Sequence, residues 1–453
     1  GIQSLFHLVK EMGLTIEEVD KLTGPVIGRP KSATFRTVDV VGLDTLVHVA
    51  NGIYENCPED EELEVFKLPK FINTLMENNW LGSKSGQGFY KKVKGENGKN
   101  MILGLDLETL EYRKGKKANF PTLELTKSVD LVIDRFKILI AGKDKAGEFY
   151  RKSFALMFAY VSKRIPEISE EFYKIDDAMK AGFGWENGPY EIWDAIGVEK
   201  GIELMKEVGK EPATWVTDML ASGIKSFYTI KNGATYYYNI IQKKHIKIPG
   251  QDSFIILNNI RKSKEVFKNS GCVVEDLGEG ILNVEFQSKM NTIGGDVLAG
   301  LNKAIDIAEK SFSGLVVGNQ GTNFSVGANI GMIFMMAVEQ EYDELNMAIK
   351  YFQDTVMRLR YSSIPTVVAP QGMTLGGGCE MTLHADRVVA AAESYIGLVE
   401  FGVGVIPGGG GSKEMALRAS DLFHKNDVEL NVLQEYFLTI GMAKVSTSAH
   451  EAY

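Results

Sequence analysis

The 453-residue sequence predicts a multidomain protein in which two all-α units are followed by an α/β domain. A segment that recurs in the first half predicts the two helical units. In the last third, strand patterns alternate with helical patterns, which is typical of a mostly parallel sheet covered by helices. The length suffices for about three domains, each with its own core.

The expected domain boundaries follow from these patterns. Helical periodicity surrounds both copies of the repeat, which predicts one unit at 1–95 and a second at 145–210. A lysine- and glycine-rich stretch predicts a linker over 96–144. Strand-like aromatics and a basic patch mark a connector over 211–270, and the α/β domain occupies 271–453.

The composition excludes several functional classes. A net charge of −9 provides no basic stripe for nucleic acid or acidic lipid. Cys57, Cys272 and Cys379 are far apart and form no C-x-x-C pair, which argues against a disulfide framework and against a metal site. We therefore expect a cytoplasmic protein without a metal. No apolar run reaches the length of a membrane span.

The repeat consists of a Gly/Pro turn, an aromatic residue and an Asp-x-x-Gly segment. The first copy has Gly28–Pro30, Phe35 and Asp39–Gly42, and the second has Asn187–Pro189, Tyr190 and Asp194–Gly197; Val19-Asp20 upstream pairs with Asp176-Asp177. An aspartate stabilises a helix N-terminus, so we expect both Asp-x-x-Gly segments at equivalent helix starts. Two copies that each expose an apolar face should superpose and pack against each other.

Two glycine runs in the last domain point to chemistry. Gly376–Gly378 separate an apolar strand from a helical run that begins near Glu380. Unshielded backbone N–H groups at a helix N-terminus stabilise a developing negative oxygen. The run therefore predicts an oxyanion hole with a carboxylate beside it. A second carboxylate, Glu400, precedes the other run, Pro407–Gly411.

A second backbone donor is expected from an upstream loop. Asn323–Ile330 follows a buried-strand pattern at Gly314–Gly318 and leads into an apolar stretch. Two strand ends would then converge on one carbonyl oxygen.

These motifs together resemble the crotonase (enoyl-CoA hydratase) family from Gly271 to the C-terminus. The resemblance rests on GANI at 327–330, GGGCE at 376–380, Glu400, and the glycine run after it. It implies an α/β domain of the ClpP/crotonase type. It also implies that the N–H groups of Ala328 and Gly377 bind a thioester oxygen, while Glu380 and Glu400 flank the α,β double bond.

The resemblance implies hydration of trans-2-enoyl-CoA to L-3-hydroxyacyl-CoA. Relatives that isomerise, hydrolyse or decarboxylate commonly lack one of the two glutamates, so the pair favours a hydratase. Asn329 replaces the usual aspartate of the family, but the donor is the preceding backbone. Further substrate contacts are implied for Lys289, Met290 and Gly327. An isomerase or another acyl-CoA reaction, and an inactive scaffold of helical domains, remain the alternatives.

The helical repeat resembles the C-terminal domain of 3-hydroxyacyl-CoA dehydrogenases. The first copy carries the resemblance at Leu22–Pro25, Phe35–Asp44 and Gly82–Tyr90, and the second, degenerate copy at Gly182–Glu186 and Gly188–Glu191. The family places an NAD-binding domain before the first copy, but no G-x-G-x-x-G follows a strand in this sequence. We therefore expect a fragment, cut at both ends, whose NAD site lies outside this chain.

The combined resemblance implies a bifunctional enzyme of fatty-acid β-oxidation. The intact protein would hydrate enoyl-CoA and then oxidise the product with NAD. It implies an acyl-CoA substrate, a homo-oligomer and a possible thiolase partner. His384 lies four residues after Glu380, but no third metal ligand is apparent, so we expect a structural histidine.

Overall fold

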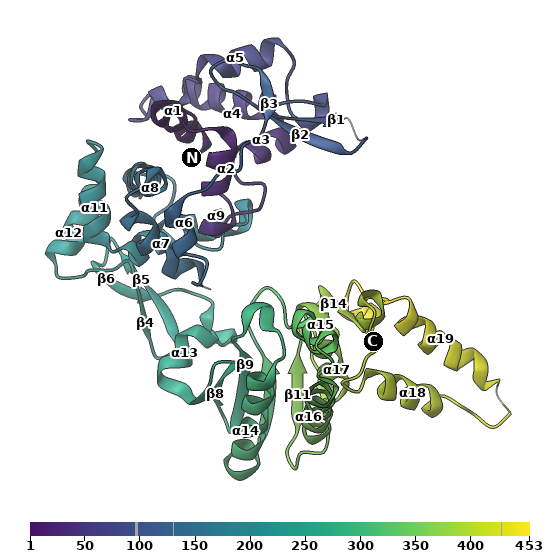
Figure 1. Cartoon of the computed structure of the whole chain (residues 1–453). Helices are drawn as coiled ribbons and strands as arrows, with labels where there is room; N and C mark the ends of the chain where they lie inside the picture. Colours follow the sequence, from purple (N-terminus) through teal and green to yellow (C-terminus); the bar gives the residue numbers. More distant parts are fainter. Residues whose placement is uncertain (96–97, 130, 427) are drawn as a thin grey trace. The chain divides into compact units, whose positions relative to one another are not determined.

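The computed structural model describes residues 1–95, 98–129, 131–426 and 428–453. Residues 96–97 and 130 of the expected linker, and residue 427 of the expected α/β domain, lie outside the described residues. The chain divides into two compact units (Figure 1). Unit 1 comprises Gly1–Thr229 and Thr235–Ile248, and unit 2 comprises Ile230–Ala234 and Pro249–Tyr453.

Unit 1 is mostly helical. Its first half contains α1 (Ile2–Met12), α2 (Ile16–Leu22), α3 (Phe35–Val41), α4 (Leu43–Asn56), α5 (Lys70–Glu77), β1 (Tyr90–Lys94), β2 (Asn100–Leu105) and β3 (Tyr112–Lys114). Its second half contains α6 (Pro121–Leu125), α7 (Val132–Ala141), α8 (Lys145–Lys163), α9 (Tyr173–Phe183), α10 (Pro189–Ile196), α11 (Val198–Glu207), α12 (Thr214–Ala221), β4 (Tyr228–Lys231), β5 (Ala234–Asn239) and β6 (Lys244–Lys247). The expected all-α units therefore each end in a small three-stranded sheet.

Local signals in the sequence account for the helix starts. At α2, the Thr15 hydroxyl accepts the N–H of Glu18, and the Glu18 carboxylate accepts the N–H of Thr15. This reciprocal capping satisfies two donors that no helical carbonyl can reach. At α8, Asp144 caps the helix by accepting the N–H of Gly147.

In each copy of the repeat, one aspartate accepts two consecutive backbone N–H groups near the end of that copy, a contact that we call the aspartate clasp. Asp39 accepts the backbone N–H groups of Phe89 and Tyr90, both at 2.8 Å. In the second copy, Asp194 accepts the N–H groups of Phe227 and Tyr228, both at 2.7 Å. The Asp-x-x-Gly segments are thus equivalent, as predicted. The expected helix start is wrong, because both aspartates lie in the preceding helices, α3 and α10.

The glycine of each segment makes the turn between helices. Gly42 has φ +107° and Gly197 has φ +105°, a backbone conformation that side chains strongly disfavour. Helices α4 and α11 begin at the next residue. The same backbone geometry therefore recurs at both positions.

A second aspartate in each copy binds the tyrosine of the clasp. The hydroxyl of Tyr90 donates to Asp20 and that of Tyr228 donates to Asp176, each at 2.7 Å. The equivalent of Asp20 is therefore Asp176, and the pairing expected from the sequence, with Asp177, is wrong by one residue. Asp177 is instead paired with Lys180 on the helix surface.

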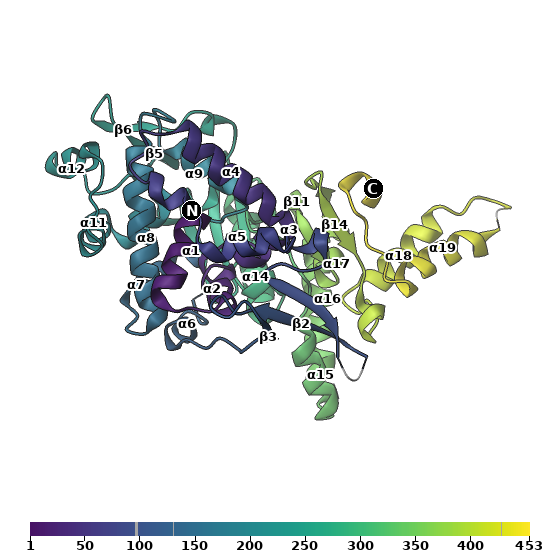
Figure 2. The ribbon, with the colours of Figure 1, turned by 90° about the horizontal axis from the view of Figure 1, so that it is seen from above.

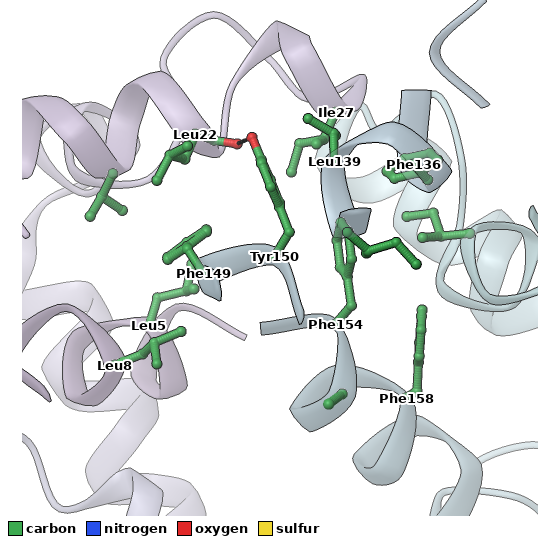
Figure 3. Close-up of a cluster of buried hydrophobic side chains, with 14 of the residues drawn as sticks. Leu5, Leu8, Leu22, Ile27, Phe136, Leu139, Phe149, Tyr150, Phe154 and Phe158 are labelled. Carbon is green, nitrogen blue, oxygen red and sulfur yellow. Dashed lines mark hydrogen bonds between the residues drawn. The ribbon is translucent and has the colours of Figure 1, made fainter. Parts of the chain in front are cut away.

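The two copies pack against each other around one core (Figure 3). The hydroxyl of Tyr150 in α8 donates to the carbonyl of Leu22 in α2, and the guanidinium of Arg29 lies 3.8 Å above the ring of Trp185. The buried side chains labelled there come from α1, α2, the 3₁₀ helix Pro25–Ile27, α7 and α8: Leu5, Leu8, Leu22, Ile27, Phe136, Leu139, Phe149, Tyr150, Phe154 and Phe158. Helices α7 and α8 lie side by side (Figure 2). The expected packing between copies is confirmed.

The regions expected as linker and connector contain buried core residues. Within 96–144, Leu105, Phe120 and Phe136 are fully or nearly fully buried, and within 211–270, Phe227 and Tyr238 are as well. The lysine-rich composition gives no sign of this burial, because each small sheet has a polar face exposed to solvent while its other face packs on the core. The second copy consequently continues beyond residue 210.

Unit 2 is an α/β fold around a six-stranded sheet with the order β13-β11-β10-β9-β8-β7. The strands are β7 (Glu265–Lys268), β8 (Cys272–Gly278), β9 (Ile281–Phe286), β10 (Gly314–Gly318), β11 (Thr366–Ala369) and β13 (Arg387–Val388). Pairs β9/β10, β10/β11 and β11/β13 are parallel, whereas β7/β8 and β8/β9 are antiparallel. The predicted parallel sheet therefore has an antiparallel edge.

Helices and a second sheet complete unit 2. The helices are α13 (Leu257–Lys264), α14 (Gly295–Ser311), α15 (Ile330–Val338), α16 (Tyr342–Arg360), α17 (Gly377–Leu383), α18 (Gly411–Asp421), α19 (Glu429–Gly441) and α20 (Ala449–Ala452). Strands β12 (Gly372–Leu375) and β14 (Ser394–Gly397) form a parallel pair. Helix α14 packs on β8, β9 and β10 (Figure 1). No helix in the described part of the chain combines the length and hydropathy that crossing a bilayer requires.

Candidate active site

A short strand-like segment brings the two predicted donor loops together. Ser325 forms a parallel bridge with Thr374 of β12, and its N–H and C=O groups bond Met373 and Leu375 at 3.1 and 2.9 Å. The loop after Ser325 and the glycine run after Leu375 therefore leave this small sheet in the same direction. The chain places both loops at one end of the strands.

The backbone N–H groups of Ala328 and Gly377 lie in these adjacent loops. A Cβ atom at Gly327 would stand 2.9 Å from the nitrogen of Gly377, and one at Gly377 would stand 3.7 Å from the nitrogen of Ala328. Gly327 has φ +86°, so this close approach requires glycine. Within the described residues, no hydrogen bond uses either N–H group as a donor. Two donors without a hydrogen-bond partner among the described residues thus lie close together.

Glu380 occupies the first turn of α17 and is 4% exposed. Its Oε1 accepts the N–H of Gly411, the first residue of α18, at 2.9 Å, and the backbone N–H groups of Gly409 and Gly410 also favour the charged carboxylate. Burial raises the pKa of Glu380 to about 7, although these three N–H groups oppose the shift. Glu380 is therefore poised to exchange a proton near neutral pH.

Glu400 begins the short 3₁₀ helix Glu400–Val403. Both of its carboxylate oxygens are buried, and neither has a hydrogen-bond partner in the described part of the chain. Burial raises the pKa of Glu400. The negative charge of Glu400 also helps to raise the pKa of Glu380. The two carboxylates are therefore close enough to interact. A buried carboxylate without a partner is costly in a protein interior and suggests a group kept for a ligand.

The predicted substrate contacts lie around the first donor loop. The short helix Lys289–Asn291 is attached to it, since the N–H of Ile293 donates to Gly327 at 2.9 Å. Lys289 and Met290 are exposed, and Met290 has φ +54°. The structure places these side chains beside the loop and open to solvent, while Gly327 is buried within it.

Two features of the site were missed in the sequence. In the sequence the glycines at 409–411 indicate only the family resemblance, whereas in the structure the N–H of Gly411 binds the carboxylate of Glu380. The ring of Phe352 in α16 lies 3.2 Å from the position of a Cβ at Gly377 and 2.6 Å from one at Gly409. Its helical periodicity marks Phe352 only as a core residue, so no sequence signal could have placed it here.

Metal ligands and the glycine-rich segment at 82–88 are the remaining candidates for a cofactor site in the described part of the chain. The described residues contain no group of three or more His, Cys, Asp or Glu side chains that could hold a metal ion. The glycine-rich segment at 82–88 is a tight turn closed by a bridge between Gly82 and Gln87, and it leads into a strand rather than a helix. It therefore does not fit the phosphates of NAD.

Known families match two segments of the chain. Residues 276–420 match the enoyl-CoA hydratase/isomerase family, and residues 2–92 match the C-terminal domain of the 3-hydroxyacyl-CoA dehydrogenases. A solved enoyl-CoA hydratase from Polaromonas sp. JS666 aligns with a TM-score of 0.34 and 21% identity, over 39% of this chain and 65% of that one.

Two curated relatives cover nearly the whole chain. A Bacillus subtilis protein named "Probable 3-hydroxyacyl-CoA dehydrogenase" is 44% identical over 100% of this chain and 56% of its own length. A Rickettsia prowazekii protein with the name of a fatty acid oxidation complex trifunctional enzyme is 26% identical over 92% of this chain and 54% of its own length. The chain thus spans about half the length of these relatives. In one polypeptide it therefore carries a segment that matches the 3-hydroxyacyl-CoA dehydrogenase C-terminal domain and a segment that matches the enoyl-CoA hydratase/isomerase family.

Proposed function

We propose that unit 2 adds water to trans-2-enoyl-CoA and forms L-3-hydroxyacyl-CoA. The observation that carries the proposal is the buried pair of Glu380 and Glu400, which lies beside two unused backbone donors. Hydration requires two proton transfers and an anionic intermediate, and this set of groups can serve all three needs.

The N–H groups of Ala328 and Gly377 bind the thioester carbonyl oxygen. As water attacks the β-carbon, negative charge develops on that oxygen, and fixed donors stabilise it without reorganisation. The bond that forms is between the water oxygen and the β-carbon. The electron pair of the double bond moves toward the α-carbon and the thioester.

The surroundings of the two glutamates suggest their roles. Glu380 accepts the N–H of Gly411, and the backbone N–H groups of Gly409 and Gly410 also favour its ionised form, so it is suited to take the proton from water. Glu400 is buried without a partner, which favours its protonated form, so it is suited to deliver a proton to the α-carbon. One proton then passes from Glu380 back to Glu400, through solvent, before the next cycle.

Hydration of crotonyl-CoA by the purified chain tests this proposal. We expect the enoyl thioester absorbance to fall and 3-hydroxybutyryl-CoA to accumulate. A 3-enoyl-CoA substrate distinguishes the isomerase alternative, because an isomerase would convert it to the 2-enoyl form. A chain that converts neither substrate would be a scaffold, and the proposal would be wrong.

We also propose that unit 1 takes part in the NAD-dependent oxidation of 3-hydroxyacyl-CoA by the intact protein. Its first copy matches a domain that accompanies NAD-dependent oxidation of 3-hydroxyacyl-CoA in its family, and the name of the Rickettsia prowazekii relative refers to fatty acid oxidation. No oxidation step is assigned to the described residues. A homo-oligomer, a thiolase partner and a cytoplasmic location remain proposals, which gel filtration, co-purification and cell fractionation would test.

A further inference from the structure

A group of polar and charged side chains, two of them buried, lies next to the helix of Glu380. His384 ends α17 and is 0% exposed, and Glu414 in α18 is 1% exposed. Lys413 and Arg360 both donate to the carboxylate of Glu414. Arg360 is the last residue of α16, so this group joins three helices.

His384 connects the helix of Glu380 to this group. Its Nδ1 lies 2.6 Å from the carbonyl oxygen of Glu380, and its Nε2 lies 2.9 Å from the Nζ of Lys413. A carbonyl oxygen only accepts, so Nδ1 carries the hydrogen, and Nε2 accepts from the lysine ammonium. Burial lowers the pKa of His384, which is consistent with this neutral form.

The His384 ring also supports the glycine turn that binds Glu380. A Cβ at Gly410 would come within 2.7 Å of the ring, and Gly410 has φ +130°. The same turn presents the N–H of Gly411 to the Glu380 carboxylate, and its next helical bond runs from the N–H of Glu414 to the carbonyl of Gly410. The ring, the turn and the start of α18 thus form one packed unit around the carboxylate.

We propose that His384, Lys413, Glu414 and Arg360 act as positioning residues that hold the 409–411 turn against the carboxylate of Glu380. None of the four contacts the carboxylate itself. They fix α18 to the end of α17, so that the N–H of Gly411 keeps the orientation that favours the ionised glutamate. This inference rests on the proposed hydratase function and adds residues that the family motifs do not include.

Other charged and titratable groups lie around Glu380, so the test must separate their electrostatic effect from an effect of geometry. They come from α17, from the turn at Glu400, from α18 and from α16: Cys379, Glu400, Lys413, Glu414, Arg418 and Arg360. A change of charge at these positions could move the titration of Glu380 through space. A neutral substitution at His384 changes the geometry without changing the charge, so it is the cleaner probe.

Two substitutions at His384 separate its two contacts. His384→Asn keeps an amide N–H near the position of Nδ1 but loses the acceptor for Lys413. His384→Gln keeps an amide oxygen near the position of Nε2 and so retains the link. We expect His384→Asn to raise the titration midpoint of Glu380 by about one pH unit, because weaker N–H bonds favour the protonated acid. We expect kcat to fall about 10- to 100-fold with little change in KM, and His384→Gln to stay close to the wild type.

The titration midpoint of Glu380 is measured by carbon-13 NMR of labelled glutamate carboxyl groups. The Glu380 signal is assigned as the one that is missing from the spectrum of the Glu380→Gln variant. This readout needs no activity, so a wild type that fails to hydrate would remove the proposed function without removing the inference. If the wild type hydrates and His384→Asn changes neither midpoint nor kcat, the inference is wrong.

A second pair of substitutions keeps the test decisive if His384→Asn does not fold. Lys413 is half-exposed, so Lys413→Met removes the donor to Nε2 at modest risk, and Lys413→Gln, which removes the same charge, keeps an N–H donor. We expect the methionine variant to behave as His384→Asn does and the glutamine variant to recover. Lys303→Met, at an exposed position of α14, is the matched control and should resemble the wild type. Equal behaviour of all three lysine variants would overturn the inference.

Discussion

Glu400 lies against Gly376, since a Cβ at Gly376 would come within 3.3 Å of its Oε1. Gly376 also has φ +53° and ψ −122°, a region essentially restricted to glycine. One residue therefore sets both the turn into the oxyanion loop and the space for the second carboxylate. The oxyanion loop and the second carboxylate therefore meet at Gly376.

Replacing this glycine should impair catalysis and stability together. We expect Gly376→Ala to lower the free energy of unfolding by about 1–3 kcal/mol, because the backbone conformation becomes strained. Displacement of Glu400 should lower kcat as well. Urea denaturation and crotonyl-CoA kinetics measure the two effects. Gly441→Ala is the control, because a Cβ there meets nothing within 4 Å.

The two glutamates should be separately required. Glu380→Gln or Glu400→Gln should slow hydration by about 10²- to 10⁴-fold, because proton transfer is lost while shape is kept. Binding of a CoA ester, measured by calorimetry, should change little. Glu393→Gln alters an exposed carboxylate and is the control. Wild-type rates in both active-site variants would contradict the mechanism.

The oxyanion donor at Ala328 can be removed without removing a side-chain function. Ala328→Pro deletes the N–H and distorts the loop, so we expect a loss of about 3–4 kcal/mol in transition-state stabilisation, read from kcat/KM. Ala328→Gly keeps the N–H and should retain most of the activity. Similar rates for proline and glycine would argue against a backbone donor at this position.

The pH dependence of hydration should follow Glu380. Its pKa is raised to about 7, so acidification below that value protonates the proposed base. We expect kcat/KM to fall about tenfold for each pH unit below about 7. The raised pKa of Glu400 predicts the opposite limb, because the proposed acid is lost as the pH rises. A flat profile between pH 5 and 7, roughly the range of the expected decline, would contradict the assignment of the base.

The aspartate clasps should make unit 1 more stable in mild acid. Burial raises the pKa of Asp20 and Asp39 to about 6, of Asp194 to about 7 and of Asp176 to about 8. A raised folded pKa means that the folded state holds more protons than the unfolded one, so stability falls as pH rises from about 4 toward these values. Thermal unfolding at several pH values measures this. A double variant, Asp176→Asn with Asp194→Asn, should flatten the dependence.

The sequence was most informative where local residues determine the chemistry. The glycines at 376–378 and the loop at Ala328 could be identified as neighbouring loops because each directly follows a strand-like segment of the sequence. The contact of Gly411 with Glu380 could not, because it depends on where α18 lies relative to α17. The same limit applies to the clasp, since the partners of Asp39 lie about 50 residues away and the register of a repeat is uncertain without them.

The clasps have a consequence for synthesis of the chain. Each closes with a tyrosine at the end of its own copy, Tyr90 in the first and Tyr228 in the second, so neither clasp borrows a residue from the other copy. The first copy can therefore complete its clasp as soon as Tyr90 has left the ribosome, while the second copy is still being made. Because domains generally fold as units during translation, the first copy would then serve as a preformed surface on which α8 can dock.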